Sequence, residues 1–182
     1  MLAAIIDRVG AVRPAFRDPT FEALARAIVY QQLNGRAART IYERFESAAG
    51  GKLKPESVLT LSEGQMRACG LSKQKLSYIR DLAAKTLSGD VDFEQLPRLA
   101  DEDVIEHLTR VRGIGVWSAQ MFLMFALRRP NVMPTGDFGI RSAIRKAYGK
   151  RKLPDAKMML KLARRWEPYR TLACYYLWRS LE

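Results

Sequence analysis

Residues 108–120 read Leu-Thr-Arg-Val-Arg-Gly-Ile-Gly-Val-Trp-Ser-Ala-Gln, and this stretch decides the predicted fold. Helical periodicity over 102–110 precedes the glycines and a strongly apolar helical run over 116–127 follows them, so two helices joined by a tight turn are predicted. Gly113 and Gly115 let the backbone of the turn take positive φ and approach another surface closely. The second helix then presents free N–H groups and the positive end of its dipole to a phosphate.

Positive charge is the strongest bulk feature of the sequence. The 182 residues contain 31 lysines and arginines against 19 acidic residues, which gives a formal net charge of +12. Residues 141–170 hold eleven basic side chains and only two acidic ones, Asp155 and Glu167. Such a stretch is either a solvated face that aids solubility or a surface that tracks phosphates with salt-sensitive affinity. Beside a phosphate-binding turn, the charge favours a nucleic acid as the partner.

The few cysteines and the single histidine exclude several classes of site. Cys69 and Cys174 stand among apolar, helix-forming neighbours, which favours two buried thiols over a disulfide. His107 is the sole histidine, so a side-chain zinc site and a Ser-His-Asp triad lack their parts. No segment resembles a signal peptide, and the longest apolar run, around 121–127, is too short to cross a bilayer. We expect no membrane partner and a cytoplasmic location, associated with the nucleoid if the chain is bacterial.

No part of the sequence alternates polar and apolar residues for long, so an all-α fold is predicted. Thr20 or Asp18 caps a helix that runs to about Gln31, with Pro19 in its first turn. The helix predicted over 72–87 packs around the glycine turn. Its lysines point outward and its apolar side chains inward, at Leu76, Ile79, Leu82, Ala83 and Leu87. Further helices are predicted over 1–10, 36–49, 55–59, 62–68, 136–148, 154–166 and 168–181.

A second motif follows the turn. Residues 133–141 read Met-Pro-Thr-Gly-Asp-Phe-Gly-Ile-Arg, and together with the turn at 111–119 they resemble the signature of the helix-hairpin-helix (HhH-GPD) base-excision DNA glycosylases. Within that superfamily the chain is most similar to the 3-methyladenine DNA glycosylase II (AlkA-type) branch. The similarity includes residues 21–32, 166–170 and Trp178, so it covers nearly the whole chain.

The resemblance implies an architecture of two helical lobes with an active cleft between them. Residues 20–130 form the central lobe, which contains the helix-hairpin-helix motif at about 102–127. Residues 1–19 and 131–182 form the second lobe, which carries Asp137. The branch's N-terminal β-domain has no counterpart here, because Thr20 comes too early in the chain to leave room for it.

Asp137 is the candidate catalytic residue. Its position after the turn at 134–136 places it at the start of a helix, where aspartate is favoured as a cap for structural reasons alone. The resemblance matches it to the catalytic aspartate of the family, and the two roles are compatible because a helix end fixes the carboxylate. The implied reaction is hydrolysis of the N-glycosidic bond of a damaged nucleotide. A fixed carboxylate stabilises the oxocarbenium-like sugar, and a cationic alkylated base leaves without an acid.

Trp117 separates two chemistries within the family. Relatives that form a Schiff base and cut the strand carry a lysine two residues after the second glycine, where this chain has Trp117. The implied enzyme is therefore monofunctional, without lyase activity. The resemblance also implies an aromatic pocket for an extruded cationic purine, formed by Trp117, Met121, Phe138 and Trp178. Ordinary core packing is the alternative for each of these residues. Met121 and Phe138 replace tyrosines of the best-known relatives.

The resemblance further assigns contacts with DNA. The loop after residue 30 matches one that enters the minor groove, with Gln32 or Leu33 as the wedge that fills the gap left by the extruded base; a simple turn is the alternative. Phosphate contact is assigned to Arg112, Gly113, Ile114 and Gly115. A monovalent cation, Na⁺ or K⁺, is expected at the backbone carbonyls of Val111 and Ile114. No other cofactor is implied, because two cysteines cannot build the four-cysteine iron–sulfur cluster of some relatives.

These features together predict a monomeric, monofunctional DNA glycosylase of base excision repair. It binds double-stranded DNA that contains damaged bases, flips an alkylated purine of the 3-methyladenine or 7-methylguanine type, and hydrolyses its glycosidic bond. One alternative is a glycosylase for another lesion, such as uracil, hypoxanthine or an etheno-adduct. The other is a non-catalytic helix-hairpin-helix module that binds DNA through its phosphates.

Overall fold

The computed structural model describes residues 1–182, and the chain is helical throughout, without a strand, which confirms the all-α prediction. It divides into two compact units that are each described separately below. Unit 1 comprises residues 1–16 and 123–182, and unit 2 comprises residues 17–122. The sequence suggested boundaries at residues 20 and 130 instead. None of the helices has both the length and the apolar character needed to cross a membrane.

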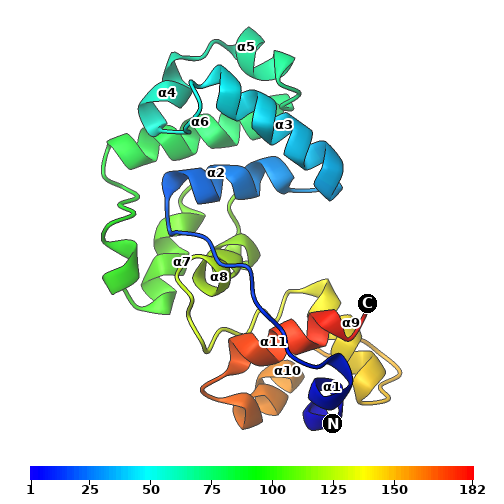
Figure 1. Cartoon of the computed structure of the whole chain (residues 1–182). Helices are drawn as coiled ribbons and strands as arrows, with labels where there is room; N and C mark the ends of the chain where they lie inside the picture. Colours follow the sequence, from blue (N-terminus) through cyan, green and yellow to red (C-terminus); the bar gives the residue numbers. More distant parts are fainter. The chain divides into compact units, whose positions relative to one another are not determined.

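Unit 2 is built around α6, which packs against α2, α4 and α5, while α3 packs against α2 and α5 (Figure 1). Its elements are α2 (Phe21–Tyr30), α3 (Gly35–Ala48), α4 (Pro55–Thr60), α5 (Glu63–Ala68), α6 (Lys73–Leu87), the 3₁₀ turn η1 (Leu96–Arg98), α7 (Asp101–Thr109) and the first part of α8 (Val116–Phe125). The predicted helices of this region are therefore present, with ends that differ by only a few residues.

The start of α2 shows how side chains fix these elements. Thr20 is the cap, and its hydroxyl accepts the N–H of Ala23 (3.2 Å), which satisfies one of the free donors at the helix end. Pro19 therefore lies before the cap, and its placement in the first turn was wrong. The expected apolar face is fully buried, at Phe21, Leu24, Ala25, Ile28 and Val29. This face anchors α2 in the core of unit 2.

The inward face predicted for α6 needs two corrections. Leu76, Ile79, Leu82 and Ala83 are buried, but Leu87 is 50% exposed, because it is the last residue of the helix and lies beyond the packed region. Lys75 does not point fully outward either. Its ammonium is partly buried and donates to the backbone of α2.

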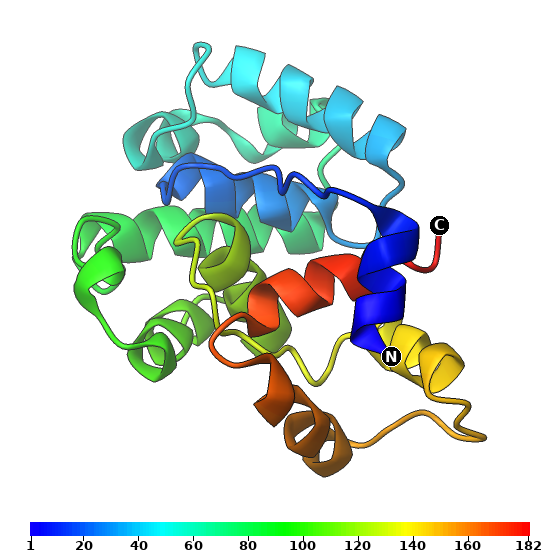
Figure 2. The ribbon, with the colours of Figure 1, turned by 60° about the horizontal axis from the view of Figure 1, so that its bottom comes forward.

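In unit 1, α11 packs against both α1 and α9 (Figure 2). The elements are α1 (Leu2–Val9), the end of α8, α9 (Phe138–Ala147), α10 (Ala156–Ala163), the 3₁₀ turn η2 (Arg164–Trp166) and α11 (Arg170–Arg179). The helices predicted over 154–166 and 168–181 each begin two residues later than expected, at Ala156 and Arg170. Both predicted thiols are buried and unpaired, Cys69 in unit 2 and Cys174 in unit 1.

The helix α8 ends earlier than its apolar run suggested. It stops at Phe125 rather than at residue 127, because Arg128 takes a left-handed backbone conformation (φ 57°) and the N–H of Arg129 donates to the carbonyl of Leu123 (2.9 Å). Pro130 thus follows a turn that has already closed the helix.

Candidate functional site

The glycine turn between α7 and α8 has the predicted hairpin geometry. Gly113 has a positive φ of 80°, and a Cβ at this position would lie 2.0 Å from Cδ2 of Tyr78 on α6. Only glycine fits there, since the backbone lies directly against the tyrosine ring. Gly115 has no positive φ, and a Cβ there would meet no atom within 4 Å. The two glycines are therefore not equivalent.

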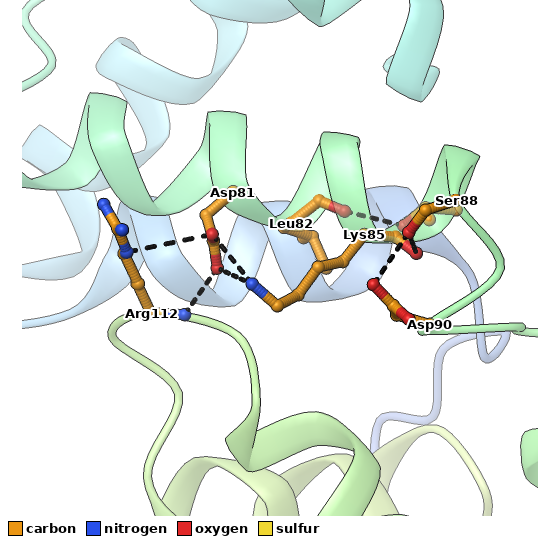
Figure 3. A network of polar contacts seen from close by, with 7 residues as sticks. Asp81, Leu82, Lys85, Ser88, Asp90 and Arg112 are labelled. Atoms are coloured by element: carbon orange, nitrogen blue, oxygen red, sulfur yellow. Dashed lines mark hydrogen bonds and ion pairs between the residues drawn. The ribbon is translucent and has the colours of Figure 1, made fainter.

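A carboxylate of α6, that of Asp81, holds the turn (Figure 3). The backbone N–H of Arg112 donates to Oδ2 of Asp81 (2.8 Å), and Nζ of Lys85 donates to both Asp81 oxygens at 2.9 and 3.0 Å. Partial burial raises the pKa of Asp81, but the Arg112 N–H and the Lys85 ammonium together outweigh burial and hold this pKa below its ordinary value. Nε of Arg112 also lies 3.8 Å from Oδ1 of Asp81, while the Arg112 side chain remains 74% exposed.

The loop that joins α2 to α3, residues 31–34, is held in a strained conformation. Gln32 has a positive φ of 56°, which residues other than glycine rarely adopt. Nε2 of Gln31 donates to the carbonyl of Gly113 (2.9 Å), so the loop is tied directly to the hairpin. Leu33 is 38% exposed and Gln32 is exposed. Strain of this kind persists where surrounding contacts over-determine the backbone, and it clusters at functional sites.

An open cavity of about 890 Å³ in unit 2 brings several predicted residues together. Both wedge candidates, Gln32 and Leu33, line it with Trp117 and Met121 of α8 and with Gly113 of the turn. Trp117 is 47% exposed although it belongs to an apolar helix, so it is not an ordinary core residue. The cavity therefore joins the predicted wedge loop, the hairpin and half of the predicted base pocket.

Asp137 lies in unit 1, where it is the cap of α9. Its Oδ1 accepts the N–H of Ile140 (2.7 Å) and the indole Nε1–H of Trp178 (2.9 Å), and the residue is only 7% exposed. The N–H at the helix end and the indole N–H together fix the direction of the carboxylate. The cap predicted from position alone is thus present, and a second donor from α11 adds to it.

Trp178 and Phe138 play different parts in unit 1. The indole of Trp178 is stacked on Phe125 (6.0 Å between ring centres) and meets Tyr175 edge to face (5.9 Å). These contacts hold it against Asp137. Gly139 makes the approach possible, because a Cβ there would lie 3.0 Å from Cδ1 of Trp178. Phe138, the first residue of α9, follows Asp137 directly and is 70% exposed.

The segment that leads to Asp137 is pinned by α11. The hydroxyl of Thr171 donates to the carbonyl of Arg129 (2.6 Å) and accepts the N–H of Val132 (3.0 Å). Burial raises the pKa of the nearby Cys174 thiol, and the charge of Asp137 raises it further, so this thiol is an inert core group. One helix thus fixes both the loop before the aspartate and the aspartate itself.

A model of the "HhH-GPD superfamily base excision DNA repair protein" family matches residues 25–168, which include the wedge loop, the hairpin and Asp137. The chain belongs to the HhH-GPD superfamily.

Individual members of the HhH-GPD superfamily match over nearly the full chain. DNA-3-methyladenine glycosylase 1 of Schizosaccharomyces pombe is 36% identical over 97% of this chain and 80% of that protein. YfjP of Bacillus subtilis is 34% identical over 100% of this chain and 66% of that protein. Among solved structures, the DNA-3-methyladenine glycosidase of Bacillus halodurans is 40% identical with a TM-score of 0.87, covering 98% of this chain and 83% of that one. The S. pombe 3-methyladenine DNA glycosylase Mag1 in complex with abasic DNA has 36% identity and a TM-score of 0.85, covering 97% of this chain and 89% of that one.

Sequence reasoning missed three side chains of this HhH-GPD chain that hold the site. Lys75, Tyr78 and Asp81 all lie on α6, which was expected to provide packing alone. Their spacing of three residues places them on one face of the helix, and that spacing was visible in the sequence. What the sequence could not show is which loops this face meets.

Proposed function

We propose that this chain is a monofunctional DNA glycosylase that extrudes an alkylated purine from duplex DNA and hydrolyses its N-glycosidic bond. The observation that carries the proposal is the buried Asp137 carboxylate with two fixed donors on Oδ1, in a member of a base excision repair superfamily. Its relatives, which include the DNA-3-methyladenine glycosylase of S. pombe, support an alkylated purine as the substrate.

The proposed chemistry uses Asp137 as an electrostatic group. As the glycosidic bond breaks, positive charge develops on the sugar, and an aspartate held by Ile140 and Trp178 faces that charge without having to reorganise. The same carboxylate orients the attacking water. The departing alkylated base takes the electrons of the broken bond and loses its own positive charge, so no general acid is required.

The proposal includes the absence of lyase activity. A Schiff base needs an amine near the sugar, and the position that carries the nucleophilic lysine in bifunctional relatives holds Trp117 here. Trp117 lines the cavity of unit 2 with Met121, and both are proposed to contact the extruded base, as are Phe138 and Trp178. The product is therefore an abasic site in an intact strand.

DNA contact is proposed through the hairpin and the wedge loop. Arg112 supplies an exposed guanidinium, and Gly113, Ile114 and Gly115 supply the turn at the start of α8. Gln32 and Leu33 are both retained as the wedge. The structural relative Mag1 is in complex with abasic DNA, which supports DNA as the partner. The working form is proposed to be a monomer.

A monovalent cation at the hairpin remains part of the proposal. The carbonyl of Val111 already accepts the N–H of Ile114 (3.1 Å), but a carbonyl oxygen has two lone pairs, so the turn still fits such an ion. Val111 and Ile114 would hold it through their backbone oxygens. When bound, Na⁺ or K⁺ would add positive charge opposite a phosphate.

The test is product analysis on duplex DNA methylated by a simple alkylating agent. The proposal predicts release of free 3-methyladenine or 7-methylguanine, strand cleavage only after alkali, and no covalent adduct with borohydride. Cleavage without alkali or a trapped adduct would contradict the monofunctional assignment. No release from methylated DNA would contradict the alkylated substrate, and parallel duplexes with uracil, hypoxanthine and ethenoadenine would then separate another lesion from a binding module.

A further inference from the structure

The face of α6 formed by Lys75, Tyr78 and Asp81, here called the α6 face, contacts the hairpin and the last turn of α2, which leads directly into the proposed wedge loop. The three residues recur at i, i+3 and i+6, so they share one side of the helix over about 9 Å. Such a rigid stretch can set the spacing between two loops that are far apart in sequence.

Lys75, at one end of this face, fixes the last turn of α2, which leads into the wedge loop. Its Nζ donates to the carbonyl of Val29 (2.6 Å) in the last turn of α2, just before residues 31–34. A cation at a helix C-terminus satisfies carbonyls that have no partner within the helix and interacts favourably with its dipole. The ammonium is therefore used within the protein and is not aimed at a phosphate.

Tyr78 and Asp81 hold the hairpin from the other end. The ring of Tyr78 lies against the backbone of Gly113, and its hydroxyl accepts Nε2 of Gln74 (2.6 Å). Asp81 accepts the N–H of Arg112, as Figure 3 shows. Both contacts act on the backbone of the turn, so they fix its position independently of side chains that touch DNA.

Gln31 closes the connection between the two loops. Its side chain donates to the carbonyl of Gly113, the same residue that Tyr78 supports. Gln32, with its strained backbone, therefore follows directly after Gln31, which is bonded to the hairpin, and lies three residues after Val29, which is bonded to Lys75. Loop, hairpin and α6 form one closed set of contacts.

From this geometry we infer that the α6 face and Gln31 position the wedge loop relative to the hairpin, so that phosphate binding at the turn and opening of the base stack occur as one event. Lys75 and Gln31 are positioning residues in this scheme. The inference rests on the proposed function, because it takes residues 31–34 as the wedge.

The test measures insertion of the wedge into DNA by fluorescence, independently of catalysis. The probe is a duplex with a tetrahydrofuran abasic analogue next to 2-aminopurine, whose fluorescence rises when its stacking is broken. Lys75→Met and Gln31→Leu each remove the donor while keeping a side chain of similar length. Each is expected to lower the fluorescence rise at saturating protein by about three- to tenfold, the effect of one lost hydrogen bond on the inserted population. Lys73→Met, on the exposed side of the same helix, is the matched control.

A double-mutant cycle and a salt titration separate positioning from other roles. Because both side chains hold the same loop, the double variant is expected to lose little more than either single variant. The salt dependence of DNA affinity is expected to match that of Lys73→Met, whereas a phosphate contact at Lys75 would lower the slope by about 0.9 more. A full fluorescence rise in both single variants, additive losses, or that extra change in slope would overturn the inference. Absence of any rise with the unaltered protein would instead contradict the proposed wedge itself.

Discussion

At the scale of single residues, the central feature is an aspartate whose direction is set by another helix. Position in the sequence predicted Asp137 as a helix cap, and the N–H of Ile140 confirms the cap. Trp178 was expected to contribute an aromatic wall. The structure shows that its indole also donates to Asp137, and that Phe125 and Tyr175 hold the indole in place. Trp178 is thus bonded to the carboxylate that is proposed to be catalytic.

This contact predicts the effect of Trp178→Phe. Phenylalanine keeps most of the stacking but lacks the N–H donor, so the single-turnover rate of base release should fall by about 10- to 100-fold, the range for a hydrogen bond to a charged group. The control is Trp166→Phe, a buried tryptophan of unit 1 in the turn η2. It should lower the melting temperature without a comparable loss of rate. Equal rate losses in both variants would contradict the role given to Trp178.

At the scale of elements, the hairpin depends on one of its two glycines for its shape. Gly113→Ala must accommodate both a positive φ and a collision with Tyr78, so it should destabilise the protein by roughly 1–3 kcal/mol in urea unfolding. Gly115→Ala meets open space and should leave the unfolding midpoint nearly unchanged. Similar midpoints for the two variants would show that the turn does not rest on the tyrosine as described.

The Asp81 carboxylate, which joins α6 to the hairpin, predicts that the stability of the protein depends on pH. The folded-state pKa of Asp81 lies below its ordinary value of 3.8, so the ionised carboxylate stabilises the fold above that value. This contribution is lost as the pH falls through the folded-state pKa. Asp81→Asn should therefore be less stable than the unaltered protein at neutral pH, and the difference should shrink below about pH 4. If urea unfolding shows the same difference in stability between the two proteins at neutral pH and below about pH 4, the ionised Asp81 carboxylate does not stabilise the fold.

The elements also show what sequence could and could not predict. Caps and apolar periodicity gave nearly every helix, because they depend on neighbours within a few residues. The contact of Gln31 with Gly113 and that of Lys75 with Val29 join residues 82 and 46 positions apart, and no local pattern encodes them. The prediction that Leu87 points inward was wrong for a related reason. The apolar periodicity continues to the end of the helix whether or not another element covers that end.

At the scale of the whole molecule, charge is the property that connects fold and proposed partner. The net charge is +12, and most basic side chains of residues 141–170 are exposed in unit 1. If they track phosphates, duplex affinity should fall by about 100-fold between 50 and 200 mM salt, as for four neutralised phosphates. Fluorescence anisotropy over that range measures the slope. A slope near zero would favour the alternative of a merely solvated face.

Asp137 is proposed to carry the chemistry and not DNA binding. Single-turnover base release from methylated duplex DNA by Asp137→Asn tests this role. Asparagine preserves the size of the side chain and can still cap α9, so duplex affinity and melting temperature should stay close to those of the unaltered protein. The rate of release should fall by at least about 100-fold, because the charge that stabilises the developing cation is gone. An unchanged rate at equal DNA saturation would contradict the account.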